Sequence, residues 1–151
     1  MSAQFPPGVS AAFMQKQAEI QKKLETEVTE IKKIEQEFQK VFRAKQSLVE
    51  KKSENEMVLA EFNLMSGDAS VYKLVGPVLA KQDTHEAKGN VEKRIEYITK
   101  EIERMDKLEQ DFQNKVDERR KNITKLQEDM RREFMKEQAN LQAAAGQQQQ
   151  W

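Results

Sequence analysis

The chain has 151 residues, of which 34% are charged and 37% are hydrophobic, with 5 Gly, 3 Pro and no Cys. High charge with few helix breakers indicates long solvated helices rather than a compact domain with a thick core. The lack of cysteine excludes disulfides and cysteine-based nucleophiles or metal sites. The balance of 26 basic against 26 acidic residues argues against nucleic acid or an anionic membrane as the main partner.

Residues 1–9 are expected to form a flexible N-terminal arm, because Phe5 is followed by two prolines and Gly8. The arm lacks the basic start and the apolar core of a secretory signal. No run elsewhere in the chain approaches the roughly 20 apolar residues of a membrane span. We therefore expect a cytoplasmic location.

Residues 10–65 are predicted to form the first coiled-coil helix, with Ser10 as a candidate N-cap. No Pro or Gly interrupts this stretch, and its apolar residues recur in alternating steps of four and three. This repeat is the signature of a coiled-coil seam. The predicted seam consists of Phe13, Gln17, Ile20, Leu24, Glu27, Ile31, Ile34, Phe38, Val41, Lys45, Leu48, Lys52, Asn55, Leu59 and Phe62.

Residues 66–83 are predicted to form a connector with a single β-hairpin. The segment Ser66-Gly67-Asp68 ends the helical pattern. Two short β-favouring runs then flank the turn residues Gly76 and Pro77.

Residues 84–142 are predicted to form the second coiled-coil helix, and residues 143–151 a disordered Gln-rich tail. The run from Asp83 to Glu86 resembles a capping box. The predicted seam consists of Val91, Ile95, Ile98, Ile102, Met105, Glu109, Phe112, Val116, Arg119, Ile123, Leu126, Met130, Glu133 and Glu137.

The predicted fold is mainly α, a long antiparallel two-helix coiled coil whose helices are joined by a single β-hairpin. Because the two helical patterns have similar lengths, residues that face each other have numbers that add to about 150. Lys45 and Glu109 are charged positions inside apolar seams, and they are predicted to pair across the interface and help to fix the register.

The hairpin is expected to be an assembly site. An isolated two-stranded hairpin is marginally stable in water, and this one has apolar residues on both faces and two edges that invite another chain's strands. The alternative is a hairpin that folds over the helix ends. The predicted assembly residues are Val71, Tyr72, Leu74, Val75, Gly76, Pro77, Val78 and Leu79.

The same hairpin carries a resemblance to a known family. The residues that carry it are Val71-Tyr72-Lys73-Leu74-Val75-Gly76-Pro77-Val78-Leu79, Glu86-Ala87 and Asn90-Val91-Glu92-Lys93-Arg94-Ile95-Glu96-Tyr97-Ile98. They resemble a β-class prefoldin subunit, best over residues 56–106, whereas the outer heptads fit any coiled coil. The α-class subunits have two hairpins, and only one fits in this connector.

The resemblance implies a heterohexamer in which this chain joins two α-class and three further β-class subunits through a shared β-barrel platform. It also implies an ATP-independent co-chaperone that captures unfolded or nascent proteins such as actin and tubulin. These proteins are then delivered to the cytosolic chaperonin. No cofactor is implied.

The ends of the helices remote from the hairpin are predicted to bind the unfolded proteins. The seam becomes polar there, at Gln17, Glu133 and Glu137, while flexible apolar side chains fall beside it. We call the predicted client-binding residues the tip cluster: Phe13, Met14, Met130, Phe134, Met135 and Leu141. The alternative is a heptad shifted by one residue, in which these side chains are core.

No enzymatic activity is predicted. His85 is the only histidine and is best interpreted as an exposed residue near a helix cap. The carboxylates fall on solvated helix faces, where perturbed pKa values are not expected. A structural coiled-coil scaffold or tether remains the alternative to a chaperone subunit.

Overall fold

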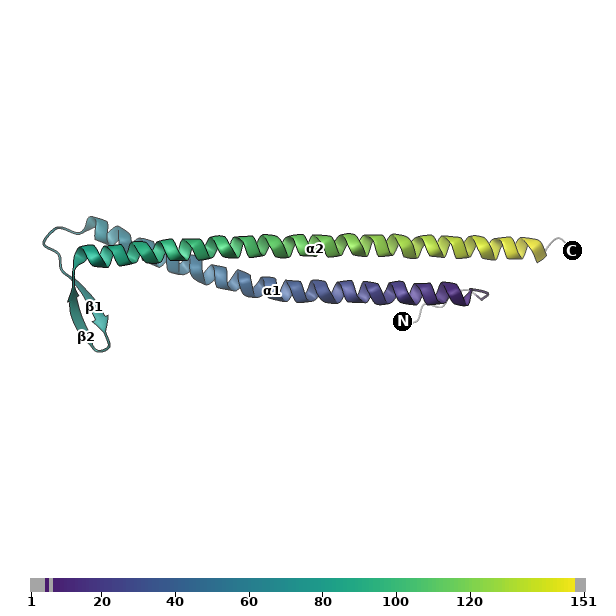
Figure 1. Cartoon of the computed structure of the whole chain (residues 1–151), viewed down its shortest axis with the longest axis horizontal. Coiled ribbons are helices and arrows are strands. Elements are labelled where there is room, and N and C mark those ends of the chain that lie inside the picture. Colours follow the sequence, from purple (N-terminus) through teal and green to yellow (C-terminus); the bar gives the residue numbers. More distant parts are fainter. Residues whose placement is uncertain (1–4, 6, 149–151) are drawn as a thin grey trace. The chain divides into compact units, whose positions relative to one another are not determined.

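The computed structural model describes residues 5 and 7–148 of the chain (Figure 1). The first helix, α1 (Ala11–Leu64), leads into the strands β1 (Val71–Val75) and β2 (Val78–Gln82), and α2 (Thr84–Gln148) follows. The helices are antiparallel and the strands form one two-stranded hairpin between them. This architecture confirms the predicted fold class.

The heptad repeats account for the two helices. Every predicted seam position of α1 and of α2 is buried or half-buried, whereas the positions between them are mostly exposed. Two helices cannot enclose a thick core, and few apolar residues in the described part of the chain are fully buried. These are Phe13, Ala87, Val91, Ile98 and Val116.

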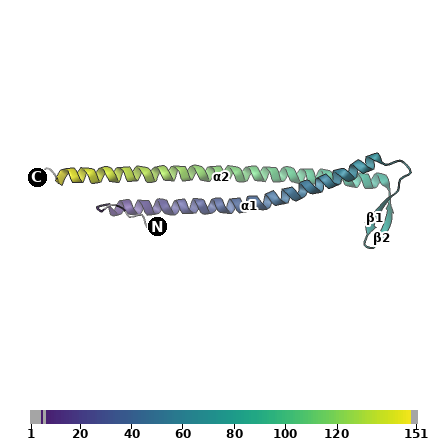
Figure 2. The same cartoon turned by 180° about the vertical axis from the view of Figure 1, so that it is seen from behind.

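Two compact units divide the chain. The terminal unit comprises Met1–Gln36 and Phe112–Trp151, and the hairpin unit comprises Glu37–Asp111. Each unit contains one segment of α1 and one of α2, and in both views the hairpin projects sideways from the beginning of α2 (Figures 1 and 2).

The helix starts are capped as the sequence predicted. The hydroxyl of Ser10 accepts a hydrogen bond from the backbone N–H of Phe13 at 3.2 Å. The carboxylate of Asp83 accepts one from the N–H of Glu86 at 2.9 Å. Each cap satisfies a backbone donor that the first helical turn leaves without a partner.

The predicted register is confirmed in the hairpin unit. The ammonium group of Lys45 lies 3.2 Å from a carboxylate oxygen of Glu109 and 2.6 Å from one of Asp106. In the terminal unit, Arg119 donates hydrogen bonds of 3.2 and 3.3 Å to the two carboxylate oxygens of Glu27. In both units, a charged seam residue of α1 thus faces an oppositely charged seam residue of α2.

The end of the second helix differs from the prediction. It was placed at residue 142, but α2 continues to Gln148, so residues 143–148 are helical rather than disordered. Residues 143–145 are alanines, the strongest helix formers, and they are followed by Gly146, Gln147 and Gln148. The favourable propensities of alanine and glutamine offset the cost of about 1 kcal/mol for the glycine, so the helix continues beyond its last seam contact. The remainder of the predicted tail, residues 149–151, lies outside the described residues.

Candidate functional site

The hairpin is held by a regular antiparallel register. Val75 pairs with Val78, Leu74 with Leu79, and the register runs back to Val71 opposite Gln82. The turn residue Gly76 has a φ of 58°, a left-handed conformation that glycine adopts without steric cost. Glycine before proline in a two-residue loop matches a tight hairpin turn whose twist suits the strands.

Apolar side chains of the hairpin are exposed on both of its faces. In the described part of the chain, Tyr72, Leu74, Val75, Val78 and Leu79 are all 56–68% exposed. Only the pair at the base of the hairpin, Val71 and Gln82, is half-buried. The helix ends therefore do not cover the apolar residues of the hairpin. The alternative, a hairpin folded over the helix ends, required them to do so.

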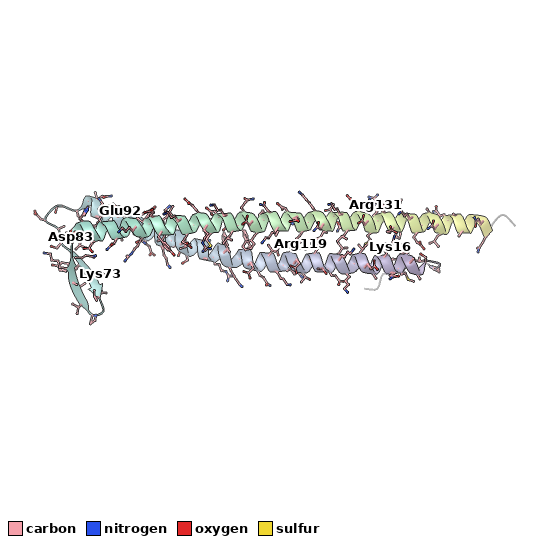
Figure 3. The ribbon with its side chains drawn as sticks, in the orientation of Figure 1. Lys16, Lys73, Asp83, Glu92, Arg119 and Arg131 are labelled. Carbon is pink, nitrogen blue, oxygen red and sulfur yellow. The ribbon has the colours of Figure 1, made fainter. Side chains whose placement is uncertain are left out.

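The part of the hairpin next to the turn, the pairs Val75–Val78 and Leu74–Leu79, contains no charged side chain. Lys73 and Lys81 lie nearer the base of the hairpin, opposite Ala80 and Tyr72 respectively. Figure 3 shows Lys73 on the projecting hairpin, with Asp83 at the beginning of α2. The two pairs next to the turn are entirely aliphatic, which suits contact with a second apolar surface.

The tip cluster lies in the terminal unit and is partly buried. Phe13 is only 5% exposed, and its ring centroid lies 6.4 Å from that of Phe134. Met130 and Leu141 are half-buried. The structure thus places Phe13 in the core rather than on an exposed surface, as expected for its position in the seam.

Three members of the tip cluster are exposed beside the seam. Met14 is 47% exposed, Phe134 45% and Met135 57%. A groove of about 750 Å³ lies between the helical segments here. It is lined by Phe5, Met14, Gln17, Ala18, Gln21, Glu25, Gln127, Met130, Arg131 and Phe134.

The polar seam positions near the tip cluster are paired rather than loose. Gln17, 8% exposed, donates a hydrogen bond of 3.3 Å to the backbone carbonyl of Met130. Glu133 lies 3.3 Å from Lys16, and Glu137 accepts two hydrogen bonds from Ser10. Figure 3 shows Lys16 and Arg119 on the side where the two helical segments face each other. The expected weakening of the seam is thus offset by cross-helix polar contacts.

The contacts that Phe5 and Gly8 of the N-terminal arm make with the helices were not predicted from the sequence. The ring of Phe5 packs edge-on against Phe13, with centroids 5.4 Å apart. Gly8 lies against Leu141. The sequence offered one signal for such a contact, the aromatic Phe5 shortly before the turn-favouring Gly8. That Phe5 packs on Phe13 can be seen only once the two helices are paired.

The described residues contain no group of three or more His, Asp or Glu side chains able to hold a metal ion. No helix within residues 7–148 is both long and apolar enough to cross a membrane.

Comparisons with known proteins identify the family. Residues 25–130 match the family Prefoldin_2, described as prefoldin subunit. The chain belongs to the prefoldin family. Prefoldin subunit 6 of Arabidopsis thaliana is 43% identical over 110 residues, which cover 73% of this chain and 85% of the relative. Prefoldin subunit 6 of Homo sapiens is 36% identical over 127 residues, covering 84% and 95% respectively.

A solved structure supports the fold. The crystal structure of the prefoldin beta subunit from Thermococcus strain KS-1 superimposes with a TM-score of 0.64 at 22% identity. The match covers 68% of this chain and 90% of that chain. The chain is thus a homologue of prefoldin subunit 6, of the β class, as the hairpin motif predicted.

As a prefoldin subunit, the chain is a non-enzymatic component of a chaperone complex that delivers nascent proteins to a chaperonin. Its partners include other prefoldin subunits. This assignment favours the chaperone interpretation over the coiled-coil scaffold.

Proposed function

We propose that the hairpin joins this subunit to two α-class and three further β-class prefoldin subunits in a heterohexamer. The observation that carries the proposal is the exposure of five large apolar side chains on the strands, all 56–68% exposed. A shared β-sheet would cover these side chains and would also pair the free edges of β1 and β2. The assembly residues are those predicted from the sequence, Val71, Tyr72, Leu74, Val75, Gly76, Pro77, Val78 and Leu79.

We further propose that the exposed part of the tip cluster captures unfolded or nascent proteins, including actin and tubulin. Met14 is 47% exposed and Met135 57%, and methionine adapts its flexible, polarizable side chain to varied apolar partners. The neighbouring groove offers space for a side chain of the bound protein. Capture of this kind needs no ATP, because it depends only on apolar contact that the unfolded protein loses when it folds.

Delivery is expected to go to the cytosolic chaperonin, and the location is expected to be cytoplasmic. The equal numbers of basic and acidic residues provide no electrostatic reason for binding to nucleic acid or to a membrane surface. We therefore propose neither nucleic acid nor a membrane as a partner.

The tip proposal is tested with the complex rebuilt around a Met14→Ser, Met135→Ser variant. The matched control is Met57→Ser, because Met57 is 63% exposed in the hairpin unit. Covering the exposed half of one methionine contributes about 1 kcal/mol, so the double variant loses about 2 kcal/mol and should bind urea-unfolded actin up to about 30-fold more weakly. Equal affinity of the double variant and the control would refute the tip proposal.

A further inference from the structure

The described residues of the N-terminal arm, Phe5 and residues 7–9, lie on the tip cluster. Phe5 and Phe13 form an edge-to-face pair, with an interplanar angle of 84°, which is a favourable aromatic geometry. Phe5 itself is only 37% exposed although it precedes the first helix. The arm therefore buries apolar surface against the same residues that are proposed to receive an unfolded protein.

Two further contacts hold the arm in this position. Gly8 has a φ of 95°, and a Cβ built there would lie 3.4 Å from Cδ2 of Leu141. The backbone N–H and the hydroxyl of Ser10 donate hydrogen bonds of 2.7 and 3.1 Å to the two carboxylate oxygens of Glu137. The turn at residues 7 and 8 therefore fits closely against α2, and the charge-assisted contact between Ser10 and Glu137 secures it.

Phe5 contributes to two adjoining cavities. One is the groove of about 750 Å³ that Met14 and Phe134 also line. The other is a small cavity of about 60 Å³ between the arm and the helices, lined by Phe5, Val9, Phe13, Phe134, Glu137, Gln138 and Leu141. The aromatic ring thus forms a wall of the groove, in the way that a bound apolar side chain would.

We propose that the arm is an intramolecular competitor of the unfolded protein, and that the groove recognises an aromatic side chain carried on a non-helical segment. The inference rests on the proposed client-binding role of the tip cluster and adds the class of side chain bound and a built-in control of affinity. An incoming aromatic residue has to displace Phe5, so the apparent affinity is reduced by the fraction of molecules in which the arm is docked.

The test follows binding at this groove alone. Because the chain has no cysteine, a Gln21→Cys substitution on the groove wall can carry an environment-sensitive dye, attached before the complex is assembled. The probes are a short Gly/Ser peptide with one central Phe, the same peptide with Ala in its place, and a synthetic peptide of residues 1–10.

Phe5→Ala should strengthen binding of the Phe peptide about two- to tenfold, the range that corresponds to loss of one aromatic pair. Gly8→Ala should act in the same direction, because an L-residue at this positive φ is strained and the docked arm is weakened while Phe5 stays in place. The matched control is Phe42→Ala, since Phe42 is 42% exposed in the hairpin unit. The peptide of residues 1–10 should compete with the Phe peptide for the Phe5→Ala complex.

Unchanged or weaker binding in the Phe5→Ala and Gly8→Ala complexes would overturn the inference. If Met14→Ser with Met135→Ser still weakened binding in that case, the client-binding proposal would stand without the competing arm. If the dye did not respond to any probe while the complex still bound unfolded actin, client binding would occur elsewhere and both proposals would fail. Equal binding of the Phe and Ala peptides would remove the aromatic preference.

Discussion

The assembly proposal makes a quantitative prediction for the hairpin. Leu74 and Leu79 are directly opposite each other in the register, so their side chains lie on one face of the hairpin. They are 68% and 65% exposed in the chain by itself. Replacing both with alanine should therefore weaken incorporation into the prefoldin complex far more than it destabilises the isolated chain.

The magnitude follows from the exposed fractions. Leucine to alanine removes three carbon atoms, and full burial of each contributes about 0.8 kcal/mol. If assembly covers the two-thirds of each side chain that is exposed, each substitution costs about 1.6 kcal/mol of association free energy and the pair about 3 kcal/mol. This loss corresponds to incorporation that is weaker on the order of 100-fold.

The assay mixes the variant with the other subunits of the complex over a range of concentrations and counts assembled particles by native mass spectrometry. Met57→Ala is the matched control, because Met57 is 63% exposed in α1 of the same unit but lies outside the strands. Circular dichroism of the isolated variants checks that both helices remain.

Two outcomes would refute the reasoning. Assembly at wild-type concentrations would mean that the exposed leucines are not covered in the complex. An equal loss of assembly in the Met57→Ala control would mean that the sensitivity is spread over exposed apolar residues in general and does not locate the interface on the hairpin.

Two further predictions concern the isolated chain. Hydrogen bonds to Asp106 and Glu109 raise the pKa of Lys45 above 10.5, so the stabilisation from charged Lys45 is present below that pH and is lost as pH rises through the folded-state pKa. The melting temperature of wild type minus that of Lys45→Met should accordingly stay constant at neutral pH and fall as the pH rises above 10.5. A difference that stays constant throughout would contradict the ion pair of Lys45 with Asp106 and Glu109. Gly76→Ala should destabilise the hairpin by about 1 kcal/mol because of its positive φ, whereas Gly89→Ala, in α2 with open space around the added Cβ, should stabilise the chain by up to about 1 kcal/mol. Hydrogen exchange of β1 and thermal melting measure the two effects, and changes of the same sign would contradict the conformational argument.

The sequence predicted most of the fold because the heptad repeat is local information. Each seam position follows from its neighbours three and four residues away, and the near-equal lengths of the two patterns fix the facing pairs. The contact between Lys45 and Glu109 could be predicted on this basis alone. The hairpin turn was equally local, since Gly76 and Pro77 stand between two β-favouring runs.

Other features could not be obtained from local pattern. The hydrogen bonds between Ser10 and Glu137 join residues 127 positions apart. They hold the start of α1 against α2, next to the position where the arm docks. Phe13 was predicted both as a seam residue and as part of a client-binding surface, and its burial depends on two aromatic rings, Phe5 and Phe134. The position at which α2 ends depends on the intrinsic helix propensity of the residues after the seam. The heptad repeat does not indicate how far the helix continues past its last seam position.

The two exposed apolar surfaces differ in side-chain stiffness in a way that matches their proposed partners. On the hairpin, Val75 and Val78 are β-branched residues with restricted rotamers, held in a hydrogen-bonded register. Such a surface presents nearly one shape and suits a partner of fixed shape, such as another subunit's strands. Beside the tip cluster, Met14 and Met135 have three rotatable bonds each and can repack around many shapes. Exchanging the two kinds of residue should therefore impair both tasks, because a flexible strand surface loses more side-chain entropy on assembly and a rigid tip fits fewer unfolded segments.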